Sequence, residues 1–223
     1  NFYIFIYMAK DLKQIVQEEY IKCAKDPVHF MRKYCKIQHP TRGKINFDLY
    51  PFQEKSLTQF KDHDYNIILK SRQLGISTLT AGYCLWGMVF NSDFNALVIA
   101  IKQDTAKNLV TKIRVMHENL PSWLRGQVLE DNKLSLRLKN GSQVKAVSSS
   151  PDAGRSEALS LLVIDEAAFI DGIDEIWTSA QQTLATGGRC IALSTPNGVG
   201  NWFHKTWVKA ESGENKFNTI RLH

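Results

Sequence analysis

Short runs of consecutive apolar residues alternate with longer segments of helical periodicity along most of this chain. The apolar runs predict strands at residues 65–69, 95–101, 134–138, 143–147, 161–164, 189–193 and 217–222. Apolar positions at three- and four-residue steps predict helices at residues 51–61, 77–90, 104–119, 174–185 and 201–211. Continuous apolar strands separated by helices are typical of a mostly parallel sheet with helices on both faces. We therefore expect an α/β fold, with Asn140-Gly141 as the turn of one hairpin.

The first part of the chain has a different pattern. Residues 11–35 show helical periodicity, which a cluster of Pro and Gly residues then interrupts. We expect residues 8–45 to form a small helical lead-in and residues 46–223 to form the main domain. Residues 1–7 are apolar, but they are far fewer than the ~18 residues that a membrane span needs. They also lack the basic segment and cleavage site of a signal peptide, so we interpret them as a non-native or disordered extension.

Composition narrows the function only slightly. The 223 residues are 43% hydrophobic and carry a formal net charge of +6, which is compatible with a polyanionic partner. The four cysteines are scattered without a C-x-x-C pair, which argues against a zinc site and against a disulfide framework. One helix carries a basic face, which could contact DNA but is more simply a solvated surface. Its residues are Lys102, Lys107, Lys112 and Arg114.

The loop after the first strand of the main domain partly matches a phosphate-binding loop. Such a loop reads G-x-x-x-x-G-K-[ST]; its backbone N–H groups hold phosphates, its Lys meets the terminal phosphates and its hydroxyl binds Mg²⁺. Gly75 and Ser77 occupy the second glycine and hydroxyl positions. Lys70 stands in place of the first glycine, and Ile76 in place of the lysine. Alone, this match is weak, since a polar strand-to-helix turn explains it equally well.

The strand at 161–164 ends in Asp165-Glu166, which is the Walker B pattern. The strand carries Asp165 to the sheet edge, where it can hold Mg²⁺, and Glu166 can polarise an attacking water. Two solvated acids at a strand end are the ordinary alternative. The carboxyl ends of parallel strands form the ligand-binding edge of such a sheet, so we expect Ser77 and Asp165 to share one Mg²⁺. The pair of motifs indicates an ATPase.

Two further segments fit a nucleotide site. Phe52 and Gln53 open the helix before the first strand, and an aromatic ring beside an amide suits adenine. Phe52 alone is as easily a core residue. The strand at 189–193 leads into Ser194-Thr-Pro-Asn-Gly198, which places small hydroxyls and an amide beside Asp165-Glu166. Such a turn is commonplace, but at this strand end it can sense a γ-phosphate.

The motifs together resemble the ATPase domain of the large terminase subunit, the DNA-packaging motor of tailed bacteriophages. The matching segments are Ser71–Gly75 with Ser77, Ser148–Arg155, Ile164–Phe169 and Ser194–Gly198. The resemblance implies a P-loop, RecA-like fold that uses ATP and Mg²⁺. It implies that the nucleotide is bound by Phe52, Gln53, Ser71, Gln73, Leu74, Gly75, Ile76, Ser77 and Thr78. It also implies that Ser77 and Asp165 bind the metal and that Glu166 is the catalytic carboxylate.

The resemblance further assigns a coupling motif and several cations. Ser194, Thr195 and Asn197 lie in the segment that links hydrolysis to movement. Arg155 resembles an arginine finger that acts on a neighbouring subunit's nucleotide, although an exposed loop arginine is the ordinary alternative. Some family members carry the loop lysine at the start of the loop. We therefore assign the phosphate role to Lys70 first and to Arg72 second.

The family implies double-stranded DNA, a portal protein and a small terminase subunit as partners, with the chain in a homo-oligomeric ring, typically a pentamer, on the procapsid. We expect it in the cytoplasm of the infected host, with no membrane association and no structural role in the virion. Packaging terminases resemble two-domain proteins, and the metal-dependent nuclease domain does not follow here. We expect no DNA cleavage by this chain.

Two alternatives remain open at this point. A helicase-like translocase would share both nucleotide motifs, but it needs a second RecA-like lobe. A degenerate P-loop domain could bind DNA or a partner without hydrolysis, and Ile76 is the observation that favours it. The intact Asp165-Glu166 pair argues against a pure binding module.

Overall fold

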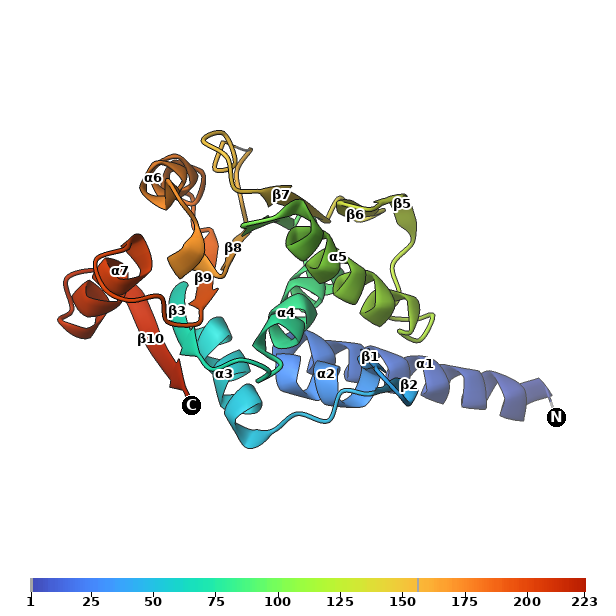
Figure 1. The fold of residues 1–223 in the computed structure, drawn as a ribbon. Helices are drawn as coiled ribbons and strands as arrows, with labels where there is room; N and C mark the ends of the chain where they lie inside the picture. The colour runs from blue at the N-terminus through green and yellow to red at the C-terminus, as the bar shows by residue number, and fades with distance from the viewer. Residues whose placement is uncertain (1, 156) are drawn as a thin grey trace.

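The computed structural model describes residues 2–155 and 157–223, with side chains from residue 11 onward. Its centre is an eight-stranded sheet in the order β10-β3-β9-β8-β4-β7-β6-β5 (Figure 1). The strands are β3 (Tyr65–Lys70), β4 (Asn95–Ala100), β5 (Val128–Asn132), β6 (Ser135–Leu138), β7 (Gln143–Ser148), β8 (Leu161–Asp165), β9 (Arg189–Ser194) and β10 (Phe217–Leu222). Neighbours from β10 through β7 pair in parallel, and β6 pairs antiparallel with both β7 and β5. The α/β prediction is confirmed.

Helices cover both faces of this sheet. They are α3 (Pro51–Asp62), α4 (Ile76–Phe90), α5 (Gln103–Glu118), α6 (Ile173–Thr183) and α7 (Trp202–Glu211), with a short 3-10 turn η1 (Ala167–Phe169). Figure 1 shows α3, α4 and α5 on one side of the strands, with α6 and α7 on the other. Each face of the sheet has its own hydrophobic core, and alternate residues of β8 contribute to each. Leu161 and Val163 belong to the core that includes residues of α3, α4 and α5, whereas Leu162 and Ile164 belong to the core that includes residues of α6 and α7. Burial on both faces explains why these strands are apolar throughout.

The N-terminal part differs from the prediction in two ways. The helical stretch at 11–35 is two helices, α1 (Phe2–Lys25) and α2 (Pro27–Tyr34). Pro27 cannot continue α1, because proline lacks an N–H and clashes with the preceding turn. It instead begins α2, where Asp26 caps the helix by accepting from the Val28 N–H at 2.9 Å. The expectation that residues 1–7 lie outside the fold stays a prediction.

The second difference is the presence of strands where none was predicted. The lead-in ends in an antiparallel pair, β1 (Lys36–His39) and β2 (Gly43–Asn46), in which Ile37 faces Ile45. These strands are short and largely exposed, so their apolar pattern is weak. The same reason explains why β5, whose residues are all exposed, was missed. The predicted hairpin around Asn140-Gly141 is confirmed as β6–β7.

One carboxylate joins α1 to α2. Oε1 of Glu19 accepts from the Tyr34 hydroxyl at 2.8 Å and from the Lys33 ammonium at 2.9 Å, and lies 2.6 Å from His29 Nε2. Lys33 and then His29 lower the pKa of Glu19 to about 2. The four cysteines of the chain are free and buried. Within the described residues, no helix combines the length and apolar character that crossing a membrane would need.

Candidate active site

The loop between β3 and α4 has the backbone of a phosphate-binding turn. Gly75 is the cap residue of α4 and lies in the left-handed region at φ 69°, which glycine adopts without strain. Gln73 also has a positive φ of 61°. Ile76, where a P-loop usually has lysine, is 1% exposed and belongs to the core under the helix. A core residue therefore occupies the position of the P-loop lysine, so a cation that binds a phosphate here has to come from another position of the chain.

Ser77 and Thr78, both half-buried, follow in the first turn of α4. The backbone N–H groups of a first helical turn have no partners inside the helix, and they favour anions. Asp165 is the last residue of β8 and is 7% exposed. Oxygen ligands of these two kinds are what Mg²⁺ prefers. The donor set fits a magnesium nucleotide.

Lys70 supplies a cation at the same edge of the sheet. It is the last residue of β3, its side chain is 10% exposed, and its Nζ lies 2.8 Å from Oε1 of Glu166. Strand β9 lies between β3 and β8 in the sheet, so the ion pair crosses the end of β9. The structure thus brings the start of the loop and the Walker B acid together, as the shared sheet edge predicts.

The two adjacent acids have different electrostatic environments. Burial raises the pKa of Asp165, and the charge of Glu166 raises it further. Burial also acts to raise the pKa of Glu166, but the hydrogen bond and charge of Lys70, together with Thr195, outweigh it, and the pKa falls below its usual value. Glu166 has a left-handed backbone at φ 49°, which is uncommon for a non-glycine residue.

The turn after β9 holds the other side of Glu166. Oε2 of Glu166 accepts from the backbone N–H of Thr195 at 3.2 Å and from its hydroxyl at 3.0 Å. Oγ of Ser194 accepts from the Ala168 N–H at 3.1 Å, and Nδ2 of Asn197 donates to the Ala168 carbonyl at 3.0 Å. The predicted coupling residues therefore contact the segment that follows Walker B.

Gln53 of α3 is hydrogen-bonded to the backbone of this loop. It is 3% exposed; its Oε1 accepts from the Tyr50 N–H at 3.0 Å, and its Nε2 donates to the Leu74 carbonyl at 3.0 Å. Both amide functions that would contact adenine thus bond within the chain. Phe52 stacks on Tyr50, with centroids 5.8 Å apart and planes 6° apart.

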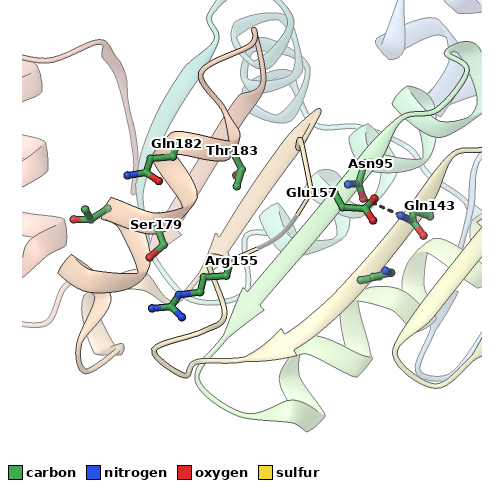
Figure 2. Close-up of a pocket in the computed structure, with 9 residues that line it drawn as sticks. Asn95, Gln143, Arg155, Glu157, Ser179, Gln182 and Thr183 are labelled. Atoms are coloured by element: carbon green, nitrogen blue, oxygen red, sulfur yellow. Dashed lines mark hydrogen bonds between the residues drawn. The ribbon is translucent and has the colours of Figure 1, made fainter.

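Among the described residues, neither predicted arginine, Arg72 or Arg155, is bonded to the Lys70–Glu166 pair. Arg72 is exposed on the loop. Arg155 is also exposed and pairs with Asp152 at 3.2 Å. Figure 2 shows Arg155 in an open polar cavity of about 890 Å³ between α6 and the amino ends of β4 and β7. Within the described part of the chain, no hydrogen bond or ion pair joins Arg155 to the Lys70–Glu166 pair. The structure therefore does not bring Arg155 to its own subunit's site.

The Gln53 contact makes a testable difference between two glycines. A Cβ on Gly75 would lie 2.8 Å from Gln53 Nε2, whereas one on Gly172, which caps α6 at φ 70°, meets nothing within 4 Å. Gly172→Ala should cost about 1 kcal/mol from backbone strain alone. Gly75→Ala should cost roughly 1–3 kcal/mol more, because the buried amide has to shift. Denaturant unfolding measures both; equal losses would mean that Gln53 does not hold the loop.

Several solved structures that resemble this fold are phage large terminases. The ATPase domain of the Thermus phage P74-26 large terminase is 21% identical over 79% of this chain and 81% of that chain, with a TM-score of 0.63. The HK97 large terminase is 18% identical over 89% of this chain and 43% of that chain, with a TM-score of 0.68. The large terminase of a thermophilic bacteriophage, in complex with ADP, is 16% identical over 78% of this chain and 45% of that chain, with a TM-score of 0.63. The chain therefore spans less than half of the two longer terminases.

The family itself is identified from the sequence. Residues 67–221 match the family model described as the terminase large subunit, T4likevirus-type, N-terminal. The matched segment contains the loop, Asp165-Glu166 and the turn after β9. This chain belongs to the T4-like family of terminase large subunits, of which residues 67–221 are the N-terminal domain.

Proposed function

We propose that this domain hydrolyses Mg·ATP and that hydrolysis drives the translocation of double-stranded DNA into a procapsid. The observation that carries the proposal is the network that joins Lys70, Glu166 and Thr195. It connects a phosphate loop, a Walker B acid and the turn after β9, which are the three parts that a motor ATPase has to couple. A module that only bound a nucleotide would have no use for the second carboxylate.

Glu166 is proposed as the catalytic carboxylate. When bound, Mg·ATP supplies the phosphoryl group and the metal that polarises it. Ser77 and Asp165 would hold the metal, and the first turn of α4 would hold the phosphates. Lys70 bonds Oε1 of Glu166 and Thr195 bonds Oε2, and the charge of Lys70 lowers the pKa of Glu166, so Glu166 is a weaker base for a water proton while the Lys70 pair is in place. We infer that Lys70 leaves Glu166 for the phosphates and thereby activates it.

Thr195 would then transmit the change to the rest of the domain. Its N–H and hydroxyl both bond Glu166, and Asn197 in the same turn bonds the Ala168 carbonyl. The turn leads into α7 through Asn201, which caps that helix. A shift of the Glu166 carboxylate therefore has a direct path to an outer element of the domain.

The partners follow from the family and from charge. We propose double-stranded DNA as the polymer moved, with the portal protein and the small terminase subunit as partners, and a homo-oligomeric ring, typically a pentamer, as the working assembly. The net charge of +6 is compatible with DNA. Arg155 is 74% exposed and lies away from its own nucleotide site, as an arginine finger acting on a neighbouring subunit has to be.

A non-hydrolysing P-loop module is the second candidate, and the burial of Ile76 is the observation that favours it. It makes a different prediction for Glu166. Such a module would bind the nucleotide equally well with Glu166 neutralised and would hydrolyse no ATP.

Steady-state hydrolysis of Mg·ATP separates the two candidates. We expect weak activity for the isolated domain and a loss of at least ~100-fold in Glu166→Gln, because a positioned general base contributes roughly 10²–10⁴ in rate. Glu175→Gln, which neutralises an exposed acid on α6, is the matched control and should hydrolyse at the wild-type rate. Identical rates for wild type and Glu166→Gln, or no Mg²⁺-dependent turnover at any protein concentration, would contradict the ATPase proposal.

Complementation tests whether Arg155 acts between subunits. Arg155→Ala retains an intact site, and Glu166→Gln retains the arginine, so each should be inactive alone at concentrations where subunits associate. An arginine finger supplies roughly 10³–10⁵ in rate. Mixing the two variants should therefore restore part of the wild-type turnover, because Glu166→Gln subunits supply Arg155 to intact sites. Absence of any restoration, or full activity of Arg155→Ala, would remove the finger role.

A further inference from the structure

Lys112 of α5 does not belong to a solvated basic face. The four cations that the sequence analysis assigned to one helix face have different environments. Lys102 is exposed just before α5, whereas Arg114 forms an ion pair with Asp131 at 2.6 Å. Lys112 is partly buried and lines a cavity that Thr78 of α4 also lines. The expectation of a single solvated face is therefore wrong for this residue.

The cavity beside Lys112 reaches the first turn of α4. Its volume is about 190 Å³, and its lining comes from β1, α4 and α5. The lining residues are Ile37, Gln38, Thr78, Thr111, Lys112, Val115 and Met116. Thr78 directly follows Ser77, the proposed metal ligand. Lys112 is the only charged residue of this lining, so the cavity places one cation beside the first turn of α4.

The charges of the active site act on Lys112. Burial lowers the pKa of Lys112, the negative charge of Asp165 opposes this, and the positive charge of Lys70 adds to it. The charge of Lys112 in turn acts to lower the pKa of Asp165. Among the described residues, no hydrogen bond or ion pair reaches the Lys112 ammonium. The ammonium keeps some contact with solvent, but partial burial of a charge without a bonded partner is still unfavourable, and an anion arriving nearby would relieve part of that cost.

We propose that Lys112 is a further nucleotide-binding residue, whose ammonium stabilises the phosphate charge of Mg·ATP from the α5 side of the site. This inference rests on the proposed function of the same site. In the present structure Lys70 is paired with Glu166, whereas Lys112, whose charge also acts on Asp165, has no ion-pair partner among the described residues. Lys112 would therefore add a second cation to the one that Lys70 supplies when it leaves Glu166. A cation from α5 also fits with an apolar residue at position 76 of the loop.

A packing role is the alternative, because the stem of a lysine can fill an apolar cavity without using its charge. The two roles differ in what the charge does. Lys112→Met keeps a stem of similar length and removes the ammonium. If the ammonium only costs desolvation, its removal leaves nucleotide affinity unchanged.

The test is the dissociation constant of the full chain for a fluorescent ATP analogue with Mg²⁺, measured together with the melting temperature of the nucleotide-free protein. We expect Lys112→Met to weaken binding by about 10-fold or more while the melting temperature stays equal or rises, since the variant loses no hydrogen bond or ion pair among the described residues and removes a partly buried charge. Lys112→Arg, which keeps the charge, should bind more tightly than Lys112→Met. Lys139→Met removes an exposed lysine next to the β6–β7 turn and should leave affinity within about 2-fold of wild type.

Three outcomes would overturn the inference. Wild-type affinity in Lys112→Met would show that the ammonium does not contact the nucleotide's charge, and the proposed ATPase function would stand. Weaker binding accompanied by a lower melting temperature of the nucleotide-free chain would assign Lys112 to packing. A wild-type chain that does not bind Mg·ATP would remove the proposed function, and this inference with it.

Discussion

The ion pair between Lys70 and Glu166 is the interaction on which the rest of the site depends. It crosses the end of β9 and joins the start of the phosphate loop to the segment after β8, with Nζ and Oε1 2.8 Å apart. A partly buried pair of this kind adds little net stability, because desolvation offsets the attraction, but the loss of one partner leaves a costly charge. The pair is therefore better suited to holding Lys70 and Glu166 in position than to stabilising the fold.

The replacement of the usual loop lysine changes where the site obtains its positive charge. Ile76 is the first residue of α4, and its buried apolar side chain packs in the core and offers no charge to a phosphate. The cations near Asp165 come instead from neighbouring elements, Lys70 from β3 and Lys112 from α5. Gln53 holds the loop backbone from α3 through the Leu74 carbonyl. The loop supplies backbone geometry, and the surrounding sheet and helices supply charge and support.

The sequence predicted most of the fold because strands buried on both faces must be apolar throughout, and their carboxyl ends must share one edge. That rule brought Lys70, Asp165 and Ser194 together correctly. Exposed strands such as β5 carry no such signal and were missed. The break before Pro27 was visible in the sequence and was overlooked.

Side-chain direction was harder to predict than position. The nucleotide contact of Gln53 stays a prediction, but its bonds to Tyr50 and Leu74 depend on how α3 packs against the loop, a tertiary contact that periodicity does not contain. Lys112 did carry a signal: it lies three residues after Leu109 and four before Met116, both buried, so it belongs to the apolar stripe of α5. The sequence analysis assigned Lys112 to a basic face because of its charge and did not consider its spacing from these buried residues.

The central claim is that Lys70 exchanges Glu166 for the nucleotide's phosphates, and a structure of this chain with Mg²⁺ and a non-hydrolysable ATP analogue tests it directly. The quantity to measure is the distance from Lys70 Nζ to Glu166 Oε1, which is 2.8 Å in the present structure. We predict that this contact is broken, that the Lys70 ammonium lies within hydrogen-bond distance of a phosphate oxygen, and that Thr195 still holds Oε2 of Glu166. A bound nucleotide with the Lys70–Glu166 pair intact would contradict the account.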